Sequence, residues 1–132
     1  MNEILLGYKY DLLNTLSHTA KATNHKLLIT LPSGTIICDP LDDNLIEKYI
    51  NNDEENIEYD PDSSAEVLFS LTARSLKEFR EANSIDHGNY PKTFPVKNVK
   101  SLNHNTIGNV PFLMIFLDQI VGVSIGNEME NQ

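Results

Sequence analysis

The chain has 132 residues, of which 40% are hydrophobic and 22% are charged. This length and composition predict one folded domain with its own apolar core and exclude wholesale disorder. Nineteen acidic residues stand against ten lysines and arginines, which gives a formal net charge of -9. Such a charge argues against direct binding to nucleic acid or to an anionic membrane.

The cysteine content and the apolar stretches bear on the compartment. A single cysteine, Cys38, excludes an intrachain disulfide and fits a reducing setting. The N-terminus lacks the basic region of a signal peptide. The longest nearly apolar stretch, 110–125, is interrupted by Asp118 and is shorter than the roughly 20 residues of a membrane span. We therefore expect a cytoplasmic protein.

The beginning of the chain carries a helix signal and a hairpin signal. Apolar side chains recur every three or four residues from residue 3 to about residue 22, which is the period of one helix face. Strand-forming residues at 26–31 and 35–38 flank a three-residue turn signal, Pro-Ser-Gly. This pattern predicts a β-hairpin.

The next segment is predicted to contain a short helix, a loop and a strand. Asp42 or Asp43 is placed to cap a helix over residues 44–51. Residues 52–64 have no apolar period and are typical of a solvated loop. The apolar run at 65–71 is interpreted as a buried strand.

A third helix should follow, capped by Thr72 or Ser75 and ending near residue 83. Residues 84–108 are rich in turn residues, and an edge strand guarded by two lysines is predicted at 96–102.

Two strands close the sequence. The first, 111–117, has a continuous apolar run that predicts burial on both faces. In the second, 119–125, apolar residues alternate with small or polar ones, so that the two kinds lie on opposite faces. Asp118 and Gln119 are interpreted as the tight turn of a hairpin in the middle of the domain. Residues 126–132 should fray.

Together these elements predict a single-domain α+β fold over residues 1–132. Hairpins between neighbouring strands imply an antiparallel or mixed sheet of about five to six strands, with helices packed on one face.

The acidic residues are concentrated in one window. Between Asp39 and Glu66, eleven acids stand with a single base, Lys48, whereas the rest of the chain carries eight acids and nine bases. A one-sign patch raises the local potential and steers partners of opposite charge. Tyrosine is also favoured at interface hot spots. We predict a partner-binding surface formed by Asp42, Asp43, Glu47, Asp53, Glu54, Glu55, Glu58, Tyr59, Asp60 and Asp62.

The same window permits two other interpretations. One is a solvated loop without a partner, and the other is a divalent-cation site. Asp60, Asp62 and Ser64 follow the first ligand positions of an EF-hand, but Ala65 and Leu71 stand where glycine and glutamate are required. The sequence therefore encodes no EF-hand, and we expect neither a metal nor a cofactor.

Outside this window, three groups of residues could serve catalysis, metal binding or anion binding. Cys38 and His25 could form a nucleophile and its base, but Cys38 ends an apolar strand, where cysteine usually packs as a small hydrophobe. The histidines lack metal-ligand spacing. The segment from His87 to Lys92 combines a histidine, a glycine and a lysine and could bind a small anion.

In size, cysteine content and segregated acidic charge, the chain is similar to bacterial antitoxin and immunity proteins, which neutralise a basic partner, often a nuclease, by direct binding. A phage-encoded inhibitor belongs to the same class. The leading hypothesis is a non-enzymatic protein-binding module of this inhibitor type. One alternative is a small-molecule-binding protein or enzyme with its site in residues 84–108. Another is a subunit of a larger assembly that uses residues 111–125 as its contact surface, and the oligomeric state is left open.

Overall fold

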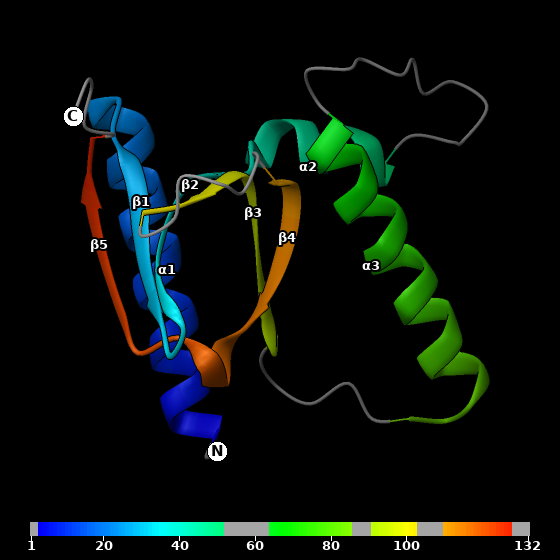
Figure 1. Cartoon of the computed structure of the whole chain (residues 1–132). Coiled ribbons are helices and arrows are strands. Elements are labelled where there is room, and N and C mark those ends of the chain that lie inside the picture. The colour runs from blue at the N-terminus through cyan, green and yellow to red at the C-terminus, as the bar shows by residue number, and fades with distance from the viewer. Residues whose placement is uncertain (1–2, 52–63, 86–90, 103–109, 128–132) are drawn as a thin grey trace. The chain divides into compact units, whose positions relative to one another are not determined.

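The computed structural model describes residues 3–51, 64–85, 91–102 and 110–127 (Figure 1). The chain divides into two compact units. The first unit joins Met1–Pro40 to Asn89–Gln132, and the second comprises Leu41–Gly88. In chain order, the second unit is therefore inserted into the first.

The first unit is a helix on an antiparallel sheet. Its five strands lie in the order β4-β3-β2-β1-β5, and every neighbouring pair is antiparallel. The α+β class and the antiparallel sheet predicted from the sequence are thus confirmed. The elements are α1 (Glu3–Thr23), β1 (Lys26–Leu31), β2 (Gly34–Pro40), β3 (Thr93–Ser101), β4 (Val110–Phe116), the 3-10 turn η3 (Leu117–Gln119) and β5 (Gly122–Gly126).

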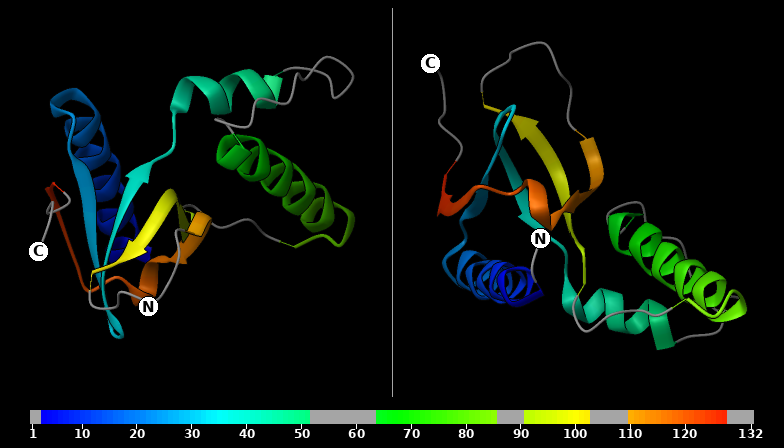
Figure 2. Two further views of the ribbon diagram at one scale, coloured as in Figure 1. Left: turned by 45° about the horizontal axis from the view of Figure 1, so that its top comes forward. Right: turned by 90° about the horizontal axis from the view of Figure 1, so that it is seen from below.

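Helix α1 covers one face of this sheet, as Figures 1 and 2 show. Leu6, Leu13 and Ala20 are buried and lie seven residues apart, so they project from one side of the helix. They join a core whose sheet residues include the fully buried Leu27 and Ile29 of β1. The apolar period in the sequence therefore predicted the helix, but its inner face only in part, because Ile4 and Tyr8 follow the same period and are exposed.

Asn24 directly follows the last residue of α1 and terminates the helix. Its φ of 56° is left-handed, the amide of His25 donates to Ala20 O at 2.8 Å, and the amide of Asn24 donates to Lys21 O at 3.3 Å. This is a Schellman motif, in which asparagine tolerates the conformation that glycine usually supplies.

The predicted hairpin at β1 and β2 is confirmed with a shorter loop. Leu31 pairs with Gly34, so two residues rather than three connect the strands. Gly34 has a φ of 138°, which glycine adopts more easily than other residues.

Strand β3 corrects the prediction of an edge strand at 96–102. It lies between β2 and β4, with Lys97 opposite both Asp39 and Phe112. The register against β2 shifts by one residue near Asn98, whose φ is 53°. This bulge places Val96 and Val99 in the same core, although they are three residues apart.

The predicted C-terminal hairpin is wrong. Strands β4 and β5 occupy opposite edges of the sheet, and the turn η3 lies between them in the chain (Figure 2). Burial of the 111–117 run on both faces is also wrong, because Phe116 is 62% exposed and its neighbour Ile115 is buried. An edge strand covered on one face leaves alternate apolar side chains in contact with water.

The second unit contains two helices, α2 (Asp43–Asn51) and α3 (Ser64–Ala82), that pack against each other (Figure 1). The strand predicted at 65–71 is wrong, because this segment is the first part of α3. Ala65, Glu66, Val67 and Ser70 are buried, at the spacing of a helix face. Thr72 and Ser75, which were expected to cap the helix, lie in its interior. The helix ends one residue before the predicted boundary.

None of the helices in the described ranges combines the length and the apolarity that crossing a membrane would require.

Candidate functional site

The structure describes three of the ten predicted partner-binding residues. Asp42 precedes α2, and Asp43 and Glu47 lie on it, all within the second unit. The other seven lie outside the described residues: Asp53, Glu54, Glu55, Glu58, Tyr59, Asp60 and Asp62.

The carboxylate of Asp42, one of the two candidates from the sequence, caps α2. Its Oδ1 accepts hydrogen bonds from the amides of Asn44 at 2.9 Å and Leu45 at 3.4 Å. A carboxylate at this position also interacts favourably with the positive end of the helix dipole. One acidic group of the predicted surface therefore has a structural role.

Asp43 and Glu47 are exposed and lie four residues apart, which places them on the same side of α2. Tyr49, by contrast, is buried, and Arg74 of α3 donates to its carbonyl oxygen at 3.4 Å. The helix thus presents two carboxylates outward while its opposite side holds α2 to α3.

Two further acids of the window, Glu66 and Asp39, make contacts within the fold. Glu66 is fully buried, and its Oε1 accepts a hydrogen bond from the amide of Asp42 at 3.3 Å. Asp39 belongs to the first unit, where its Oδ1 lies 2.9 Å from Lys26 Nζ and its Oδ2 accepts from Asn98 at 3.0 Å. The charge count from the sequence could not separate these structural carboxylates from the exposed ones.

Cys38 lies in the core of the first unit. Burial raises the pKa of its thiol from 9.0 to about 12, and the adjacent carboxylate of Asp39 acts in the same direction. Its Sγ donates a long hydrogen bond to Leu27 O at 3.8 Å. His25 is engaged with Thr23, with 2.7 Å between Nδ1 and Oγ1. A buried, protonated thiol is the opposite of an activated nucleophile.

We expect Cys38 in the folded protein to resist iodoacetamide near neutral pH, because the thiolate is the reacting form and burial disfavours it. The same thiol should react readily once the chain is unfolded in concentrated urea. Mass spectrometry of the alkylated protein measures both. Equal alkylation rates in the two conditions would contradict the burial of this thiol.

The raised pKa of the Cys38 thiol also makes the free energy of unfolding depend on pH. The folded state binds the thiol proton more tightly than the unfolded state, so this contribution is complete below a pH of about 9 and is lost as the pH rises toward 12. The stability difference between the wild type and Cys38→Ala should therefore shrink above pH 9, as measured by urea unfolding at several pH values. A difference that stays constant up to pH 12 would oppose this assignment.

The described residues contain no group of three or more histidine, cysteine, aspartate or glutamate side chains that could hold a metal ion. Asp60 and Asp62, which resembled EF-hand ligands in the sequence, lie outside the described residues. His87, which belongs to the alternative site at 84–108, also lies outside the described residues. Within that range, Thr93–Ser101 forms strand β3.

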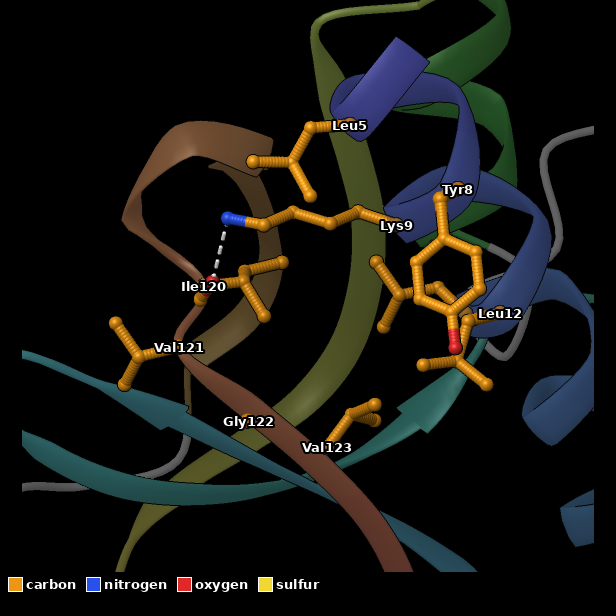
Figure 3. Close-up of a pocket in the computed structure, with 9 residues that line it drawn as sticks. Leu5, Tyr8, Lys9, Leu12, Ile120, Val121, Gly122 and Val123 are labelled. Atoms are coloured by element: carbon orange, nitrogen blue, oxygen red, sulfur yellow. Dashed lines mark hydrogen bonds between the residues drawn. The ribbon is translucent and has the colours of Figure 1, made fainter. Parts of the chain in front are cut away.

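A cavity of about 230 Å³ lies between α1 and the segment that enters β5, entirely within the first unit. In Figure 3 the side chain of Lys9 extends from α1 across to Ile120, and Tyr8 and Leu12 stand on the helix side. Apart from Tyr8 and Lys9, the side chains that line the cavity are apolar: Leu5, Leu12, Leu13, Ile120, Val121 and Val123.

Lys9 is the main polar feature of this cavity. Its half-buried ammonium donates to the carbonyl oxygens of Ile120 at 2.7 Å and Leu117 at 3.0 Å. Sequence reasoning did not single out Lys9. The signal was available, because a lysine between Leu5 and Leu12 interrupts the apolar side of a helix, where only a long stem lets the charge reach polar atoms.

No family model matches the chain, and no match was found among the curated proteins or the solved structures.

Proposed function

We propose that the protein is a non-enzymatic protein-binding module that neutralises a basic protein partner through its acidic window, as inhibitors of the antitoxin and immunity type do. The observation that carries this proposal is the segregation of charge. Eleven of the nineteen acids lie between Asp39 and Glu66, with one base among them.

Three carboxylates of the window have contacts within the fold. Glu66 is buried, Asp39 is paired with Lys26, and Asp42 caps a helix. Asp43 and Glu47 have exposed side chains on α2. The docking surface of the proposal therefore consists of Asp43, Glu47 and the acidic residues between 53 and 62.

A basic partner such as a nuclease fits this surface chemically. Nuclease sites are rich in basic side chains because they bind phosphates. Carboxylates of an inhibitor can occupy the positions of these phosphates. Charge complementarity of this kind acts mainly on the rate of encounter, and steering can raise association rates by roughly tenfold or more.

The test is a variant in which Asp53, Glu54, Glu55 and Glu58 are replaced by asparagine or glutamine. Side-chain size is retained while four charges are removed, so association with the co-purified basic partner should slow by roughly tenfold at low salt. The wild-type rate should itself fall as salt rises, because the Debye length shrinks from about 10 Å at 0.1 M to about 3 Å at 1 M. Stopped-flow kinetics at two salt concentrations measure both effects.

A matched control removes four exposed carboxylates from outside the window, Asp11, Glu78, Glu81 and Asp118. Its net charge equals that of the test variant, so a general charge effect would slow both variants alike. The proposal requires that only the window variant associates slowly. Equal association rates for the window variant and the wild type at low salt would refute it.

A further inference from the structure

The cavity beside α1 combines an apolar interior with a cation, the ammonium of Lys9. Among the described residues, no carboxylate forms an ion pair with Lys9. The two carbonyl oxygens that accept from Nζ are neutral, and an ammonium has three N–H donors. One donor and the full positive charge are therefore available to a further acceptor.

The volume of the cavity indicates how large an apolar group it can cover. A cavity of about 150 Å³ lined by apolar side chains accommodates benzene, with six carbons. By proportion, about 230 Å³ holds roughly nine carbons, which corresponds to a short alkyl chain or a small substituted ring. Because the walls are apolar, the part of a ligand that lies inside the cavity should be apolar as well.

The exposure of the lining residues shows where a polar group would lie. Tyr8 is 64% exposed and Val121 is 67% exposed, whereas Leu13 and Ile120 are buried. The cavity therefore has an apolar floor and an open rim. The half-buried Lys9 extends across it, as Figure 3 shows, and ends at Ile120.

We propose that this cavity binds a small monocarboxylic acid with an apolar body of about six to nine carbons. The apolar body lies on Leu13 and Ile120, and the carboxylate accepts the remaining N–H of Lys9. Carboxylate and ammonium form a charge-assisted hydrogen bond, which is about twice as strong as a neutral one. This site belongs to the first unit and is independent of the acidic window.

The binding experiment uses the full chain, labelled with 15N, and two probes of equal chain length, octanoate and octanol. We expect octanoate to shift the amide signals of residues 5–13 and 120–123, and octanol to bind the same place at least about tenfold more weakly, because it lacks the negative charge. Equal affinities for the two probes would overturn the assignment of an anion. So would the absence of any shift with octanoate at millimolar concentration.

Variants locate the interaction. Lys9→Met keeps the apolar stem and removes the charge, so it should weaken octanoate binding at least about tenfold and change octanol binding by less than about twofold. Lys9→Arg keeps the cation and should retain octanoate binding. Lys21→Met, on the same helix, is the matched control and should have no effect. An unchanged octanoate affinity in Lys9→Met would overturn the proposal.

Val123→Phe adds bulk to the wall of the cavity and should abolish binding of both probes. Because binding elsewhere would survive this change, unaltered affinity in a folded Val123→Phe protein would also overturn the proposal. If Lys9→Met does not fold, the comparison of octanoate with octanol on the wild type and on Lys9→Arg still decides the question.

Discussion

Replacing Leu117 with alanine is expected to lower the free energy of unfolding by about 2–5 kcal/mol. Leu117 is fully buried in the core of the first unit. It also begins η3, where its amide donates to Lys92 O at 2.9 Å and its carbonyl accepts from Ile120 at 3.2 Å. Truncation removes buried apolar contacts and leaves a cavity at the position where the chain leaves β4.

The adjacent Phe116 provides the matched control. Its side chain is 62% exposed, so Phe116→Ala should cost less than about 1 kcal/mol, although phenylalanine is the larger residue. Urea unfolding of both variants, followed by circular dichroism, measures the contrast. Similar losses in the two proteins would contradict the contrast between the buried Leu117 and the exposed Phe116. The apolar run alone would have predicted a large loss at Phe116.

Local patterns in the sequence predicted α1, the β1–β2 hairpin and α2. In each case the signal and the structure it specifies lie within a few residues, as with Asn24 at the end of α1 and Asp42 at the start of α2. Periodicity and capping are properties of one segment, and one segment of sequence is enough to show them.

The pairing of strands was not predictable in the same way. The runs at 111–117 and 119–125 are close in sequence, which favoured a hairpin, yet they lie at opposite edges of the sheet. Their true neighbours are β3 for the first and β1 for the second, and the second of these is about a hundred residues distant. No local pattern encodes that choice.

The segment 65–71 shows a second limit of prediction from local sequence patterns. A seven-residue run rich in apolar residues fits a buried strand and a helix face equally well, and length decides between them. Here the helix continues to Ala82, so the run is the first part of α3. Glu66, one of the eleven acids of the window, is therefore buried on a helix face, which the interpretation as a strand did not predict.

Asn98 is the residue for which the second large stability effect is expected. Its φ of 53° places it in the left-handed region at the bulge of β3, and its Nδ2 donates to Asp39 Oδ2 at 3.0 Å. Asparagine tolerates this conformation, whereas a β-branched residue does so only under strain. The bulge is what allows both Val96 and Val99 to reach the core.

Asn98→Val is therefore expected to lower the free energy of unfolding by about 1–3 kcal/mol, through strain at the bulge or through loss of the register that buries Val99. Asn98→Gly removes the same hydrogen bond to Asp39 but accepts a positive φ, so its stability should stay within about 1 kcal/mol of the wild type. Both variants are compared by urea unfolding. Both variants lose the exposed side-chain hydrogen bond. The difference between their free energies of unfolding therefore measures the effect of the backbone conformation at residue 98. If valine and glycine proved equally stable at this position, the left-handed residue would not be what holds the bulge, and the burial of Val99 would need another cause.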